Sequence, residues 1–79
     1  MNFKIITLDE LELNCKGTIK KLNCLGNIRR RFLDLGLIEG TTIKPVLISA
    51  CGDPVAYEIR GTIIAIRSED SKLVDISIE

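Results

Sequence analysis

Apolar and polar residues alternate at every second position along three stretches in the second half of the chain. The stretches are Val55/Tyr57/Ile59, Thr62/Ile64/Ile66 and Val74/Ile76/Ile78. A period of two is typical of a β-strand that buries one face, because successive side chains of a strand point to opposite sides. The pattern therefore predicts three short strands in this half of the chain.

The first two of these strands are expected to form a hairpin across Arg60-Gly61. A two-residue loop puts the apolar partners on the same face, as a hairpin requires. The full register pairs Ile59 with Thr62, Tyr57 with Ile64 and Val55 with Ile66. Arginine is unusual at a turn position that needs a positive φ, so a bulge at Gly61 is the alternative.

The first half of the chain predicts one helical turn and two more strands. Thr7 and Glu10 have the spacing of a capping box, which favours a turn over residues 8–11 with Leu8 and Leu11 pointing inward. Residues 17–22 and 42–49 are expected to be strands. Proline cannot donate a hydrogen bond to a neighbouring strand, so the second of them is expected to be an edge strand, or to be bulged, at Pro45.

One helix is expected over residues 25–35. On a helix of 3.6 residues per turn, Leu25, Ile28, Phe32 and Leu35 fall within one sector about 80° wide. Gly36 follows directly, as a left-handed residue after a helix commonly does. Asn23 and Asn27 are both candidates for the N-cap.

These elements predict a mainly β fold of about five short strands with one inserted α-helix. A chain of 79 residues buries little core, and closing the sheet into a small barrel removes its exposed edges. We therefore expect a single domain over residues 1–79 with the architecture of a small SH3-like β-barrel.

Composition excludes several classes of function. Eleven basic residues balance eleven acidic ones, whereas nucleic-acid-binding domains usually carry a basic excess. The chain has no His and no Trp, one Tyr and two Phe. It therefore lacks the commonest general base, the commonest metal ligand and an aromatic surface for stacking bases. The sequence also offers no pair of a nucleophile and a base from which an enzyme active site could be built.

The cysteines and the apolar runs bear on the cellular compartment. The three cysteines show no C-x-x-C spacing, which argues against a disulfide framework and a zinc knuckle. The chain does not open with a signal peptide, and its apolar runs are far shorter than the roughly 20 residues that span a bilayer. We expect a reduced cytoplasmic protein that does not insert into the membrane.

Short motifs distributed along the whole chain resemble the FeoA domain family. The longest is R-x-L-D-L-G-L-x-x-G, present here from Arg31 to Gly40 with Phe32 at the second position. The others are Leu8-x-x-Leu11, Gly17-x-Ile19, Gly52-Asp53-Pro54, Arg60-Gly61 and Ala65-Ile66-Arg67. The order and spacing of these motifs carry the resemblance, which extends to the C-terminal SH3-like domain of iron-dependent repressors.

The resemblance implies an SH3-like fold and a role in bacterial ferrous iron transport. The expected partner is the cytosolic region of FeoB, the membrane ferrous iron permease with a GTP-binding domain. The chain is then a small cytosolic accessory protein that binds and modulates this permease. The matched motifs are glycines, leucines and turn residues, so the resemblance implies no catalytic residues.

The run Arg29-Arg30-Arg31 has two interpretations. On the helical wheel Arg30 points away from the apolar sector, and Asp34 lies within pairing distance of Arg30 and Arg31 along the helix. The run is then a solvated helix face with pairs inside the helix. The alternative is a contact with the acidic surface of a partner, where arginine is favoured over lysine.

Three residues are predicted to border a docking surface: Arg30, Leu33 and Ile48. Leu33 lies about 120° from the centre of the apolar sector, so it is expected to be exposed. Ile48 belongs to a strand with consecutive apolar residues, which place apolar side chains on both of its faces. An exposed apolar patch formed by such residues would be a partner site.

No cofactor or metal site is expected. Asp9, Glu10 and Glu12 form one acidic cluster and Glu69 and Asp70 another, but durable iron sites normally include imidazole. The link to iron is therefore expected to run through the permease.

Two other possibilities remain open. The alternative function is a stand-alone SH3-like regulatory or nucleic-acid-associated module related to iron-dependent repressors. The strand that contains Pro45 is also a candidate edge for pairing with a second copy of the chain.

Overall fold

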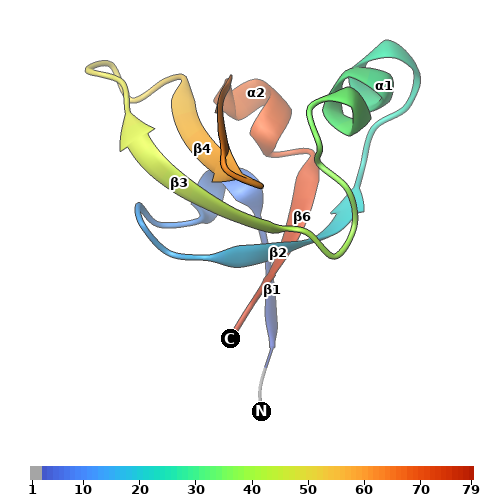
Figure 1. Ribbon diagram of the computed structural model, residues 1–79, viewed down its shortest axis with the longest axis horizontal. Coiled ribbons are helices and arrows are strands. Elements are labelled where there is room, and N and C mark those ends of the chain that lie inside the picture. The colour runs from blue at the N-terminus through green and yellow to red at the C-terminus, as the bar shows by residue number, and fades with distance from the viewer. Residues whose placement is uncertain (1–2) are drawn as a thin grey trace.

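Six strands form one antiparallel sheet in the computed structural model, which describes residues 3–79 (Figure 1). The strands follow the order β1-β6-β2-β3-β4-β5 across the sheet. Along the chain the elements are β1 (Lys4–Thr7), the 3-10 helix η1 (Leu8–Glu10), β2 (Gly17–Leu22), α1 (Gly26–Asp34), β3 (Thr42–Ile48), β4 (Val55–Ile59), β5 (Thr62–Ile66), α2 (Ser68–Ser71) and β6 (Val74–Ile78). The predicted mainly β class with one inserted helix is confirmed.

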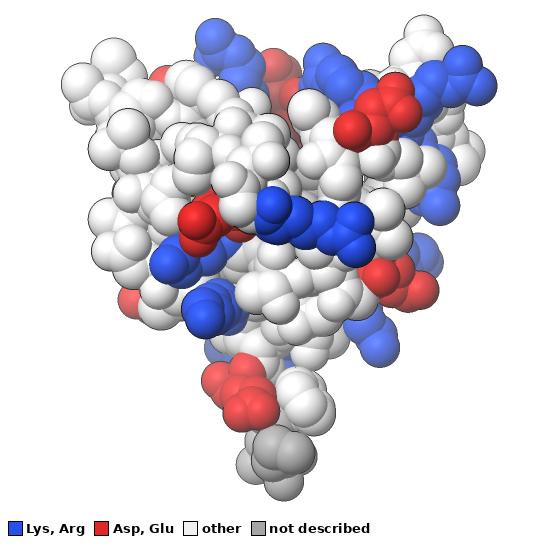
Figure 2. All heavy atoms as spheres, in the orientation of Figure 1, with Lys and Arg blue, Asp and Glu red and all other residues white. Residues whose placement is uncertain are grey.

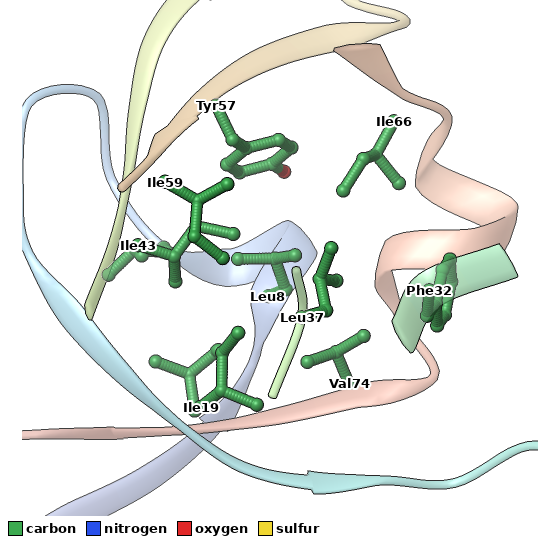
Figure 3. Packing of buried hydrophobic residues seen from close by; sticks show 11 residues of the cluster. Leu8, Ile19, Phe32, Leu37, Ile43, Tyr57, Ile59, Ile66 and Val74 are labelled. Atoms are coloured by element: carbon green, nitrogen blue, oxygen red, sulfur yellow. The ribbon is translucent and has the colours of Figure 1, made fainter. Parts of the chain in front are cut away.

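The sheet folds over its own core at β2. This strand pairs with β6 along most of its length but with β3 only at Gly17 and Thr18. Side chains from the two halves of the sheet therefore face one another. Figure 3 shows those of β4, β2 and β6 pointing into one interior, with Leu8 and Leu37 between them. The buried apolar core consists of Leu8, Leu11, Ile19, Phe32, Leu37, Ile43, Tyr57, Ile59, Ile66, Val74 and Ile76.

Strand β1 is the sixth strand, which the sequence pattern did not predict. Its four residues, K-I-I-T, contain two adjacent isoleucines and so lack a clear alternation. Pairing with β6 is what makes this segment a strand, with Ile6 opposite Ile76. Because Lys4 lies opposite Ile78, the beginning and end of the described chain are side by side.

The hairpin formed by β4 and β5 has the predicted register. Val55 pairs with Ile66, Tyr57 with Ile64 and Ile59 with Thr62. Arg60 and Gly61 both have positive φ, at 52° and 79°. Two successive residues with positive φ are typical of the tight two-residue turn whose twist matches that of a hairpin. The arginine therefore adopts the unusual conformation, and the register needs no bulge at Gly61.

The turn before β2 also forms as predicted. Thr7 backbone N–H donates to Glu10 Oε1 at 3.1 Å, as in a capping box, and Leu8 and Leu11 are buried. Leu8 lies at the centre of the core in Figure 3. This single turn thus fills the space that the folded sheet encloses.

Helix α1 differs from the prediction at its start and on its apolar face. It begins at Gly26, and Leu25 precedes it with 86% of its surface exposed. No side chain caps the helix, so neither Asn23 nor Asn27 has the predicted role. Phe32 is its one buried residue, because so short a helix touches the core over only one turn. The other apolar residues of the predicted sector, Ile28 and Leu35, are exposed.

The arginines of α1 also pair differently from the prediction. Arg31 Nη2 lies 2.8 Å from Asp70 Oδ2 of α2, so this ion pair connects two helices. Within residues 3–79 the other ion pair joins Lys44 and Glu58, and Asp34 is in neither. The predicted pairing of Asp34 with Arg30 or Arg31 is therefore wrong. Arg31 pairs with a carboxylate on another helix, and the helical wheel of α1 alone does not reveal such a partner.

Strand β3 is bulged at Pro45, which is one of the two alternatives that the sequence predicted. Its ladder with β4 shifts between Pro45 and Leu47. In the sheet order β3 lies between β2 and β4, but it pairs with β2 only at Thr42 and Ile43, so at Pro45 it has a strand partner on one side alone. On its other side the Pro45 carbonyl accepts a hydrogen bond from the Asn14 backbone N–H at 2.7 Å. The edge that we expected to be open is thus covered at this point.

Strand β2 passes so close to β6 at Gly17 that a side chain has no room there. A Cβ on Gly17 would overlap Ile76 Cγ2 and would lie 3.3 Å from Leu11 Cδ2. Ile76 is fully buried and cannot move aside. The glycine of the Gly17-x-Ile19 motif is therefore required by packing.

We predict that Gly17→Ala lowers the free energy of unfolding by about 1–3 kcal/mol, the usual cost of overpacking a core. Urea denaturation followed by circular dichroism measures the change. Thr18→Ala is the matched control, since Thr18 is the exposed neighbour on the same strand, and it should stay within about 0.5 kcal/mol of the wild type. A Gly17→Ala protein as stable as the control would contradict the packing account.

Tyr57 is a buried titratable group in the middle of the core. Burial raises the pKa of its hydroxyl, a hydrogen bond with the Ser71 side chain lowers that pKa, and the carboxylates of Asp9 and Asp53 raise it, with a net rise. An unfolded tyrosine has a pKa of about 10. The neutral hydroxyl therefore stabilises the fold fully below about pH 10, and this contribution is lost as the pH rises through the folded-state pKa.

We predict that the phenolate absorbance near 295 nm rises with a midpoint above about pH 10 in the folded protein. Tyr57 is the single Tyr in a chain without Trp, so the signal is unambiguous. The stability of Tyr57→Phe should fall less between pH 9 and pH 11 than that of the wild type. A midpoint at or below that of free tyrosine would show that burial does not raise the pKa of Tyr57.

Candidate partner-binding surface

Most of the exposed large apolar side chains lie on two separate parts of the molecule. The helix surface comprises Leu25, Ile28, Leu33, Leu35 and Ile38, which lie on α1 and on the segments beside it. The hairpin surface comprises Leu47 and Ile48 at the end of β3, together with the exposed Ala50 and Cys51 of the following turn. Between Pro45 and Tyr57 the one charged residue is Asp53. Figure 2 accordingly shows a broad uncharged region at the upper left of the molecule, over the end of β3 and β4.

The structure places the three predicted docking residues on both of these parts. Arg30 and Leu33 lie on α1, and both are exposed, Leu33 with 41% of its surface accessible. Ile48 is exposed to 48% at the end of β3. Figure 1 shows that β3 ends on the opposite side of the molecule from α1. The three residues therefore do not form one contiguous patch, although each of them faces solvent.

Leu33 lines a hollow between α1 and β2. The hollow has a volume of about 200 Å³ and is lined by Ile19, Lys20, Lys21, Leu22, Arg29, Leu33 and Glu39. Arg29 spans its end, since its Nη1 donates to the Leu22 carbonyl of β2 at 3.4 Å. The leucine that the helical wheel directs away from the core therefore faces β2.

A second hollow continues the first along the outer side of β2. It has a volume of about 360 Å³ and is lined by Phe3, Ile5, Thr18, Ile19, Lys20, Glu39, Gly40 and Ser77. Ile19, Lys20 and Glu39 line both hollows. We call the combined depression, from Leu33 at one end to Phe3 at the other, the β2 groove. Sequence reasoning missed it, because it is formed by residues from both ends of the chain.

The predicted acidic cluster contributes to a different hollow, of about 460 Å³. It is lined by Lys4, Ile6, Glu10, Leu11, Glu12, Cys15, Lys16, Ile78 and Glu79. Within residues 3–79 no three His, Cys, Asp or Glu side chains come close enough together to hold a metal ion. The carboxylates here stand beside lysines, as on an ordinary charged surface.

Charge is mixed over the molecule. Figure 2 shows basic and acidic side chains interspersed on the visible face, without an extended field of either sign. The chain as a whole has a formal net charge of zero. Among the described residues no helix is long and apolar enough to cross a membrane.

The comparison with known families decides the family of the chain. A model described as FeoA domain matches residues 6–78, nearly the whole sequence. The chain belongs to the FeoA domain family. The family resemblance that the motifs indicated is therefore confirmed. Three glycines of the motifs have backbone roles in this structure. Gly17 allows the close contact between strands, and Gly36 and Gly40 adopt positive φ in turns.

Two curated relatives differ greatly in length from each other. A "Fe(2+) transport protein A/Fe(2+) transporter FeoB fusion protein" of Porphyromonas gingivalis is 30% identical over 71 residues, which cover 90% of this FeoA domain but 8% of the fusion protein. A "Putative Fe(2+) transport protein A" of Campylobacter jejuni is 25% identical over 73 residues, 92% of this chain and 99% of that protein. The chain therefore spans a small part of the first relative and nearly all of the second.

A solved structure supports the SH3-like description of the fold. The Stenotrophomonas maltophilia FeoA, crystallised with zinc, is 27% identical and has a TM-score of 0.80, over 90% of this chain and 88% of that one. It is described as a prokaryotic SH3 domain protein and suggested as an activating factor of bacterial ferrous iron transport. The predicted SH3-like class is thus confirmed, with six strands in place of about five.

Proposed function

We propose that this FeoA domain is a non-catalytic, cytoplasmic accessory protein of ferrous iron uptake that binds a FeoB-type permease and modulates it through protein–protein contacts. The observation that carries the proposal is the fusion relative, in which a segment 30% identical to this chain is part of the same polypeptide as a FeoB transporter. Fusion keeps two parts at an effective concentration in the millimolar range when the linker is short and flexible. Such an arrangement is useful where the two parts act together.

The exposed apolar surfaces fit a protein partner. Interface cores are rich in apolar residues and arginine, and a few central side chains carry most of the affinity. The helix surface offers Leu33 beside Arg30, and the hairpin surface offers Ile48. We propose Leu33 and Arg30 as the main docking residues, with Ile48 as part of a second contact. The two surfaces are far enough apart to be tested separately.

In this function the permease, and not the FeoA domain, binds and transports the iron ion. The domain contributes binding surface, and the effect of the accessory protein reaches the ion through the transporter. The alternative of a nucleic-acid-associated module requires a basic surface, whereas the chain has a formal net charge of zero and the face seen in Figure 2 has mixed charge.

We predict that Leu33→Asp weakens binding to the cytosolic region of the permease by at least about tenfold in Kd, since an interface residue that matters is worth more than about 1 kcal/mol. Ile48→Asp should have a smaller effect if it borders a second contact. Binding is measured by calorimetry with the two purified proteins, with and without guanine nucleotide.

Leu13→Asp is the matched control, because Leu13 is exposed to 42%, nearly the same fraction as Leu33, and lies on the loop before β2. It should bind as the wild type does, and circular dichroism should show all variants folded. If Leu33→Asp binds like the control, Leu33 is not in the docking surface. If the wild-type domain does not bind the permease region at all, the proposed function is wrong.

A further inference from the structure

Two consecutive lysines of β2 both face solvent, and a β-bulge is the reason. Ile19 lies opposite Ile76 on β6, but the next paired residue is Lys21, opposite Asp75. Lys20 is therefore an extra residue in the ladder. In a regular ladder Lys21 would point to the same side as the buried Ile19, because residues two apart in a strand share a face. With the bulge, Lys20 and Lys21 are both exposed.

The bulge thereby concentrates positive charge along the β2 groove. Lys20, Lys21 and Arg29 line it, against one carboxylate, Glu39. Within residues 3–79 the two ion pairs are Arg31–Asp70 and Lys44–Glu58, so these three cations have no carboxylate within ion-pair distance. Asp75, the cross-strand neighbour of Lys21, is not among the residues that line the groove. The groove has an excess of positive charge in a chain that is neutral overall.

The same groove has apolar side chains at both ends. Leu33 lies at the α1 end, and Phe3 and Ile5 lie at the β1 end. All three are exposed large apolar residues. The buried Ile19 is in the lining between them. A ligand that fits this arrangement has apolar groups for the two ends and negative charge for the lysines between them.

We propose that the β2 groove is the recognition site for an acidic segment of the permease that carries apolar anchor residues. This inference rests on the proposed function and specifies the chemistry of the partner. Apolar anchors seated at Leu33 and at Phe3 would supply most of the affinity. Carboxylates facing Lys20, Lys21 and Arg29 would supply specificity and speed of association. The bulge is then a specificity device, since it turns Lys21 from the interior towards the partner.

The observations favour an acidic polypeptide over a nucleic acid or an anionic membrane. A phosphate backbone or a lipid surface is usually held by a wide basic face, and the visible face of this molecule has mixed charge. Phe3 is the one aromatic residue that lines the groove, which leaves little surface for stacking bases. Acidic peptide segments with apolar anchors match the lining of the groove.

The test uses the ¹⁵N-labelled domain and the recombinant cytosolic region of the FeoB-type permease from the same organism. Chemical-shift changes should concentrate at residues 18–21, at Leu33 and at Glu39. Lys20→Glu/Lys21→Glu should weaken binding by at least about tenfold, and the Kd of the wild type should rise with salt more steeply than that of this variant. Arg60→Glu/Lys72→Glu makes the same change in net charge at exposed positions outside the groove and should leave Kd within about twofold of the wild type.

A neutral variant, Lys20→Gln/Lys21→Gln, keeps the test valid if the reversed charges disturb the strand, and it should weaken binding by several fold. Binding by the wild type with the groove variants unaffected, or with shift changes confined to the hairpin surface, would overturn the groove while leaving the proposed function intact. Absence of binding by the wild type would overturn both. The same NMR titration is done with a single-stranded RNA oligonucleotide and with phosphatidylserine vesicles. The inference would also be overturned if either changed the chemical shifts of the groove residues at a lower concentration than the permease region does.

Discussion

The close contact of β2 with β6 at Gly17 is the constraint on which the rest of the fold depends. Beyond Thr18, β2 stays paired with β6 and separates from β3, so the sheet turns over its core at this point. The turn lets Tyr57 and Ile59 face Ile19 and lets the single turn of η1 fill the centre. A side chain at Gly17 would push the two strands apart, and the interior would then have to be repacked.

Local rules in the sequence predicted most of the fold, and they failed where distant residues decide the outcome. The β4–β5 hairpin, the turn at Leu8 and the class of the fold follow from alternation, capping and turn chemistry, which involve neighbouring residues. Strand β1 depends on its partner β6, so its own four residues carry little signal. Helix α1 has an apolar sector that the fold leaves mostly exposed, because α1 contacts the core only through Phe32.

The same distinction holds for the candidate site. The helical wheel correctly placed Leu33 in solvent, and consecutive apolar residues correctly indicated exposure of Ile48. Their separation, and the position of Leu33 opposite the lysines of β2, depend on how α1 sits on the sheet. The orientation of Lys21 could not be predicted either, because one extra residue in a ladder reverses the side to which all later residues point. A bulge is set by both strands of a pair, and β2 has no proline to indicate one, as Pro45 does in β3.

The pairing of Lys4 with Ile78 has a consequence for how the domain can be joined to other proteins. Both ends of the described chain leave from nearly the same point, next to Phe3 at one end of the β2 groove. A linker of a given length therefore explores the same volume whether it extends from one end or from the other. The order of the domain and a transporter along a joined polypeptide would then be geometrically neutral, and linker length alone would set how often the two meet.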